Sequence, residues 1–147
     1  MKIIRFFVFF FYCLLVNMEK INAQNEHSFI LKISNIKNSN AKIKIAFYNS
    51  ESSFLNEKEI FKGKELIPPN KGEIKIKFDD IPFGDYGIAV FQDKNGNNKL
   101  DTNFLGYPSE PFAFSNNFRP KFSAPKFKDC KITFSKINNS FFINLIN

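Results

Sequence analysis

The chain has 147 residues, of which 44% are hydrophobic and 24% are charged. This length and composition fit one globular domain with a buried core. The formal net charge is +7, but nearly all basic residues are lysine, and the aromatic residues are mostly phenylalanine at strand spacing rather than interleaved with arginine. This pattern argues against a nucleic-acid-binding protein.

The N-terminus has the pattern of a secretory signal peptide. Lys2 and Arg5 precede the apolar run FFVFFFYCLLV (6–16), and a small residue follows at the cleavage position. The run is shorter than the ~20 apolar residues that a bilayer-spanning helix needs. We therefore predict that residues 1–23 are removed and that 24–147 is a single domain, secreted or periplasmic, without a transmembrane span. An uncleaved anchor or a buried N-terminal helix is the alternative.

Apolar and polar residues alternate with a period of two along most of the mature chain. This pattern predicts strands that turn one face to a core and one to water. The strands are expected at residues 29–33, 42–47, 73–78, 86–91, 130–134 and 141–146. The segment 86–91 is apolar on both faces, as a central strand should be. Turn residues separate them. About seven short strands without a strong helix indicate an all-β fold, an immunoglobulin-like or transthyretin-like antiparallel β-sandwich.

Residues 49–67 break this alternation and could contain one helical turn. They are polar, with a few scattered apolar side chains.

The polar segment DKNGNNKLD (93–101) follows the strand expected at 86–91. In order, oxygen ligands could come from the side chains of Asp93, Asn95 and Asn97, the Lys99 carbonyl and the Asp101 side chain. This order matches places 1, 3, 5, 7 and 9 of an EF-hand loop, and Asn98 at place 6 tolerates the left-handed turn needed there. The glutamate of place 12 is absent, so we expect weak calcium binding, in the ~0.1–1 mM range. The alternative is a polar turn satisfied by its own amide side chains.

Residues 102–127 form a long connection with four prolines and many aromatic residues. Loops longer than ~15 residues in compact domains are usually functional or disordered, and aromatic residues are scarce in disordered segments. We therefore expect a ligand surface here. Its candidate residues are Phe104, Tyr107, Phe112, Phe114 and Phe118.

Few residues are available for nucleophilic or zinc chemistry. His27 is the only histidine, and Cys130 is the only cysteine after residue 23. Ser-His and Cys-His pairs and zinc sites with several such ligands are therefore excluded. Cys130 alternates with apolar residues, which predicts burial. No catalytic residue is assigned.

The segment 78–117 also carries a long motif. Its elements are Phe78, Pro82, Gly84, Tyr86, Asp93, Asn95, Asn97, Leu100, Asp101, Asn103, Gly106, Pro108, Ser115, Asn116 and Asn117. In these residues the chain resembles an uncharacterised bacterial family, domain of unknown function 2141. Gln92 stands where that family has histidine, and Asn98 where it has glycine. The resemblance implies an exported bacterial β-sandwich. The Pro-x-Gly-x-Tyr element is also similar to transthyretin-like and collagen-adhesin modules, some of which carry calcium loops.

Three hypotheses follow for the function. The first is an exported binding or accessory module with a calcium-type loop, whose partner is a cell-envelope glycan or another envelope protein. The second, less favoured, is a glycan-active enzyme that uses Asp93, Asp101 or Glu110. The third is a purely structural envelope protein whose aromatic residues pack inward.

Overall fold

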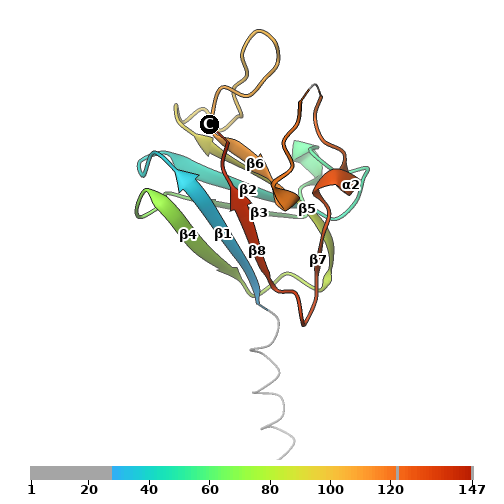
Figure 1. Cartoon of the computed structure of the whole chain (residues 1–147). Coiled ribbons are helices and arrows are strands. Elements are labelled where there is room, and N and C mark those ends of the chain that lie inside the picture. The colour runs from blue at the N-terminus through green and yellow to red at the C-terminus, as the bar shows by residue number, and fades with distance from the viewer. Residues whose placement is uncertain (1–27, 122, 147) are drawn as a thin grey trace, which may run out of the picture.

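The computed structural model describes residues 28–121 and 123–146 (Figure 1). The predicted signal peptide and His27 lie outside the described residues. Within them, no helix is both long and apolar enough to cross a membrane. The elements in chain order are β1 (Phe29–Ile36), β2 (Lys42–Tyr48), η1 (Glu57–Glu59), β3 (Lys62–Leu66), β4 (Gly72–Phe78), β5 (Gly84–Asp93), β6 (Phe112–Phe114), η2 (Ser115–Asn117), α2 (Phe127–Cys130), β7 (Ile132–Phe134) and β8 (Ser140–Asn144).

The strands form two sheets, which confirms the predicted all-β fold (Figure 1). The smaller sheet has the order β4-β1-β8, and the larger has the order β3-β2-β5-β6. β7 continues the edge of the larger sheet, because it pairs with the first half of β5 and β6 pairs with the second half. One pair departs from the antiparallel pattern, since β8 runs parallel to β1.

The main core lies between the two sheets and follows from the alternation in the sequence. Phe29, Leu31 and Ile33 of β1 are each 0% exposed, and they share one buried cluster with the alternating apolar residues of β2, β4, β5 and β8. The Phe29 ring lies 5.1 Å from the ring centroids of both Phe47 and Phe134. These edge-to-face contacts join a strand of the smaller sheet to two strands of the larger sheet.

A second apolar cluster forms around β6. It buries Phe112, Phe114 and Cys130, against which Phe91 and Leu100 are packed. Phe91 and Phe112 are directly opposite each other in β5 and β6, while their neighbours Val90 and Ala113 belong to the main core. The cluster therefore covers part of the larger sheet's outer face. Cys130 is buried, as its alternation predicts, and burial, aided by the nearby Asp129 carboxylate, raises the pKa of its thiol to about 12.

Candidate ligand groove and polar loop

A groove of about 1130 Å³ lies over the outer face of the larger sheet. Its floor contains Gly63, Ala46 and Ala89, which are in register across β3, β2 and β5. Side chains in register on neighbouring strands stand side by side on one face of a sheet, so three small ones in a row leave a depression there. The groove is thus built by the pairing of three strands that are distant in sequence.

The walls of the groove come from the two segments that break the strand pattern. Leu55 and Ile60, from the segment before β3, line one part. Tyr107 and Pro125, from the long connection, line another. The segments that the sequence left without regular structure therefore meet over the same sheet.

The structure separates the five aromatic residues predicted to form a ligand surface. Tyr107, Phe112 and Phe114 line the groove, although Phe112 and Phe114 are only 2% and 8% exposed. Phe104 is 95% exposed and lies outside the groove lining. Phe118 is half-buried against the second cluster.

The long connection begins with a small hairpin, residues 101–109, which projects from one end of the sandwich (Figure 1). The Ser109 N–H donates to the Asp101 carbonyl at 2.8 Å, and the Asn103 N–H donates to the Tyr107 carbonyl at 2.8 Å. A bridge between residues 102 and 108 lies between these two hydrogen bonds. The projecting segment is therefore a defined hairpin, which we call the tip hairpin.

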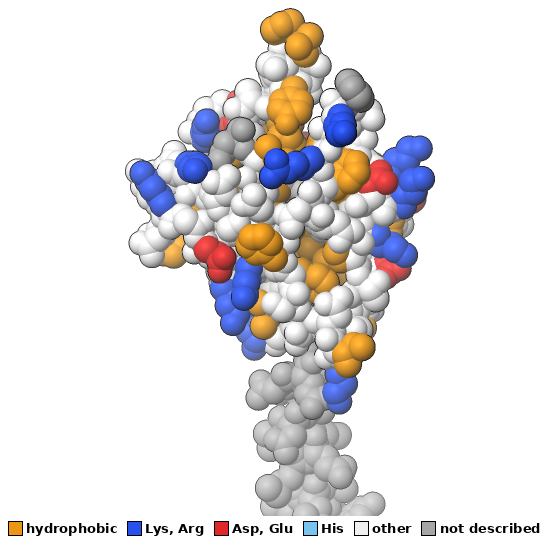
Figure 2. Space-filling model, viewed as in Figure 1, with side chains coloured by type: hydrophobic (Ala, Val, Ile, Leu, Met, Phe, Trp, Pro, Cys, Tyr) orange, Lys and Arg blue, Asp and Glu red, His pale blue; other side chains and the backbone are white. Residues whose placement is uncertain are grey.

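The Asn103 side chain closes the turn of the tip hairpin. Its Oδ1 accepts from the N–H groups of Leu105 at 2.9 Å and Tyr107 at 3.0 Å. Gly106 supplies a φ of 79°, which other residues rarely adopt. Phe104 and Leu105 remain in solvent, and Figure 2 shows hydrophobic side chains at this end of the molecule.

Asp93, the first predicted calcium ligand, is only 2% exposed at the end of β5. Its Oδ1 accepts from the Gly96 N–H at 2.7 Å, and its Oδ2 accepts from the Asn98 N–H at 2.8 Å. Asn98 has a φ of 65°, the left-handed conformation expected at the sixth place. The two oxygens of the buried Asp93 carboxylate thus fix the backbone of the turn.

The structure brings three other predicted ligands together. The amide groups of Asn95 and Asn97 donate to the two oxygens of Asp101 at 2.6 and 2.9 Å. Each amide oxygen accepts the N–H two residues further on, from Asn97 and Lys99 respectively. For Lys99, the hydrogen bond within the loop uses its N–H, while the ligand predicted from the sequence is its carbonyl.

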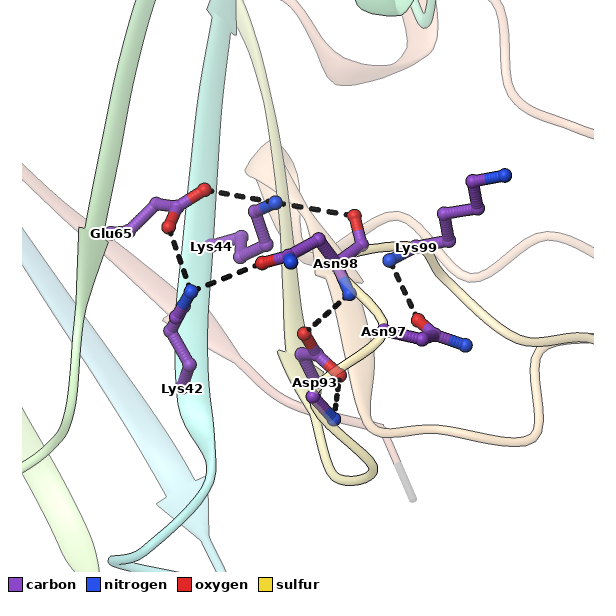
Figure 3. Close-up of polar contacts among 8 residues, drawn as sticks. Lys42, Lys44, Glu65, Asp93, Asn97, Asn98 and Lys99 are labelled. Carbon is purple, nitrogen blue, oxygen red and sulfur yellow. Dashed lines mark hydrogen bonds and ion pairs between the residues drawn. The ribbon is translucent and has the colours of Figure 1, made fainter.

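Two lysines of β2 dock this loop onto the sheet (Figure 3). The Lys42 ammonium donates to Asn98 Oδ1 at 3.0 Å, and the Lys44 ammonium donates to the Asn98 carbonyl at 3.2 Å. Both also pair with Glu65 of β3, at 3.1 and 2.8 Å. The ammonium groups of Lys44 and Lys42 hold the pKa of the Glu65 carboxyl below its ordinary value.

Glu110 ties the loop to the tip hairpin. Its side chain is buried, and its two oxygens accept from the N–H groups of Lys94 at 2.6 Å and Asp101 at 3.1 Å. Asp93, Asp101 and Glu110 are all absent from the groove lining. The three carboxylates considered for glycan chemistry therefore serve the loop itself in this structure, and they do not face the groove.

The sequence reasoning missed the role of Ser115, Asn116 and Asn117 in η2. Ser115 Oγ accepts a β5 N–H at 2.8 Å, Asn116 donates to the carbonyl before β7 at 2.8 Å, and Asn117 accepts a β8 N–H at 2.7 Å. Asn116 and Asn117 have φ values of 60° and 51°. Two consecutive asparagines after a strand were the available signal, because asparagine tolerates this conformation and pairs with backbone groups.

Comparison with other proteins places these features in a family. Neither the curated proteins nor the solved structures yield a match to this chain. A family model does match residues 31–141, and it is described as an uncharacterized protein conserved in bacteria (DUF2141). This range contains the groove floor, the polar loop, the tip hairpin and η2. Because the match spans most of its length, the chain belongs to the DUF2141 family of uncharacterized bacterial proteins.

Proposed function

We propose that this protein is an exported binding module that holds a mainly apolar ligand in the groove. Export rests on the charged and apolar pattern of residues 1–23. The groove carries the binding proposal: its volume of about 1130 Å³ is close to the roughly 300–1,000 Å³ of small-molecule sites, which are also mostly apolar.

The lining indicates what kind of ligand would fit. Phe91 and Tyr107 offer aromatic surface, which suits apolar groups and the C–H faces of sugars. Charged residues of both signs also line the groove, among them Lys64, Lys121 and Glu57. This combination favours an envelope glycan or an apolar segment of an envelope protein.

Filling the floor of the groove should weaken binding without affecting the core. The mature chain is titrated with the apolar dye 1-anilinonaphthalene-8-sulfonate, whose fluorescence rises on transfer from water to an apolar site. We expect saturable binding to the native protein, weakened about tenfold or more by Ala46→Phe, because the added ring occupies space that a ligand needs. Soluble peptidoglycan fragments are added in a second arm, and displacement of the dye would identify a glycan ligand.

Glu73→Phe is the matched control, since it adds the same ring at an exposed position of β4. It should leave dye binding unchanged, as should Phe104→Ser outside the groove. Dye binding that is equally strong in native protein and Ala46→Phe would refute the groove as the site.

As a second function, we propose weak calcium binding by the polar loop. The supporting observation is that the side chains of Asn95 and Asn97 contact the Asp101 carboxylate through their NH₂ groups. All three side chains also carry oxygen atoms of the type that calcium prefers. The ligands would be those three, with the Lys99 carbonyl and Asp93 completing the predicted set. Two amide groups already contact the Asp101 carboxylate, so a cation competes with them and its affinity should be low.

Calcium should therefore stabilise the mature protein modestly. A concentration ten times Kd adds about 1.4 kcal/mol, which corresponds to a rise in Tm of several degrees for a domain of this size. We expect a higher Tm in 5 mM calcium than in EDTA, and the difference should vanish in Asp101→Asn. Asp80→Asn, outside the loop, should retain it. Equal Tm values in calcium and EDTA would leave the loop as a polar turn.

A further inference from the structure

We propose that the tip hairpin docks this protein on the surface of an anionic lipid bilayer. The segment 102–109 contains no Asp, Glu, Lys or Arg. At its end, Phe104 is 95% exposed and Leu105 is 76% exposed. Turns normally carry polar residues, so two adjacent large apolar side chains held in water require an explanation. Leu105 also lines the groove, so the vesicle test below includes the groove variant Ala46→Phe.

Three backbone N–H groups of the tip have partners within the hairpin. The N–H groups of Leu105 and Tyr107 donate to Asn103 Oδ1, and the Gly106 N–H donates to the Asn103 carbonyl at 2.9 Å. An N–H group without a partner is costly to remove from water, and this cost normally keeps irregular loops out of the apolar layer. Because these three groups are paired within the hairpin, the tip can enter a bilayer interface without exposing them.

The charges next to the tip hairpin complement an anionic surface. Lys94, Lys99 and Lys121 are exposed, and none of the ion pairs in the described part of the chain includes them. Figure 2 shows Lys and Arg side chains on the surface below the tip. The nearby acids are engaged: Asp101 accepts two amide groups and Glu110 is buried. Each lysine near an anionic membrane increases the affinity for that membrane by about a factor of five.

The size of the apolar tip favours a bilayer over a folded protein partner. One phenylalanine and one leucine can bury roughly 300 Å² between them, whereas a specific protein interface needs about 1,000 Å² or more. A bilayer needs no matching pocket, since apolar side chains enter its interface and neighbouring cations contact its headgroups. Apolar insertion combined with cationic attraction supplies the two signals that stable surface binding requires.

Vesicle binding by the mature chain tests this proposal. Phosphatidylglycerol–phosphatidylcholine vesicles are compared with phosphatidylcholine alone, in EDTA to remove any contribution of calcium. We expect the protein to sediment with the anionic vesicles and to bind the neutral vesicles at least about tenfold more weakly. High salt should weaken its binding to the anionic vesicles. The double variant Phe104→Ser/Leu105→Ser should lose about tenfold or more of its binding to anionic vesicles.

Ile137→Ser is the matched control, because Ile137 is 97% exposed in the β7–β8 turn at the opposite end of the molecule (Figure 1). Ile137→Ser should bind anionic vesicles as the native protein does. Ala46→Phe should also bind them normally, and this result would distinguish membrane binding from ligand binding in the groove. The chain has no tryptophan, so Phe104→Trp adds a single reporter whose emission should shift to the blue on vesicles, unlike that of Ile137→Trp. The proposal would be overturned if the native protein did not bind anionic vesicles, or if the double variant bound them equally well. It would also be overturned if the protein formed a dimer through the tip and did not bind vesicles.

Discussion

Phe29→Ala is expected to destabilise the protein by about 4 kcal/mol, the range for loss of a buried phenyl ring. Phe29 is fully buried and its ring contacts those of Phe47, Phe78, Phe134 and Phe141. Removing the ring leaves a cavity between the sheets, and no new contact replaces those that are lost. Because domains are stable by only about 5–15 kcal/mol, this is a large fraction of the total. Urea denaturation, with native and variant m-values compared, measures the loss directly.

Phe142→Ala is the control for this substitution. Phe142 lies in β8, next to β1, but its side chain is 48% exposed. Its truncation should change stability by about 0.5 kcal/mol or less, as is usual for surface positions. Similar losses for the two variants would contradict the placement of the core between the sheets.

Glu110→Gln is expected to cost about 2–3 kcal/mol, although glutamine has nearly the same shape as glutamate. Both carboxylate oxygens of Glu110 accept backbone N–H groups, from Lys94 and Asp101. An amide has only one oxygen, so its NH₂ group must face one of these donors and leave it without a partner. Hydrogen bonds to a buried charge contribute more than neutral ones, about 1.5–3 kcal/mol. Denaturation curves should show the loss, and amide hydrogen exchange should accelerate at Lys94 and Asp101.

Glu73→Gln provides the comparison, because Glu73 is exposed on β4. It should leave both stability and exchange near native values. If Glu110→Gln were as stable as the native protein, with unchanged exchange at both amides, Glu110 would not be the link between the polar loop and the tip hairpin. It would then again be available for the chemistry that a glycan-active enzyme needs.

The candidate sites share one structural element, the connection that leaves β5. Its first part is the polar loop, its second is the tip hairpin, and residues from both of these parts and from the last part line the groove. Asp93 and Glu110 fix the backbone at both ends of the polar loop. The position of the tip therefore depends on buried carboxylates, and loss of either should disturb more than one proposed site.

Local sequence determined the strands that form the main core. Period-two alternation predicted strands at 29–33, 42–47 and 73–78, and an apolar run on both faces predicted one at 86–91. These four segments lie within β1, β2, β4 and β5. Alternation is visible in the first three because each turns apolar residues to the core at every second position. The sequence also predicted the place of the polar loop and the left-handed conformation of Asn98, because glycine and asparagine have distinct backbone preferences.

Two strands escaped prediction for opposite physical reasons. β3 is an edge strand with mostly exposed residues, so its sequence KGKEL has no apolar alternation. β6 is buried on both faces, so its sequence FAF is continuously apolar and too short to distinguish from other apolar runs. The parallel pairing of β8 with β1 was also missed, because strand order depends on contacts between distant parts of the chain.

Only the tertiary structure decided where a ligand could bind. The groove exists because Gly63, Ala46 and Ala89 fall in register on three strands, and no local pattern records the register of separate strands. Likewise, the sequence grouped Phe104 with Phe112 and Phe114, but packing buried the latter two and left Phe104 in solvent. Sequence determines which side chains are apolar, whereas folding determines which of them find a partner, since burial depends on the neighbours that the whole chain supplies.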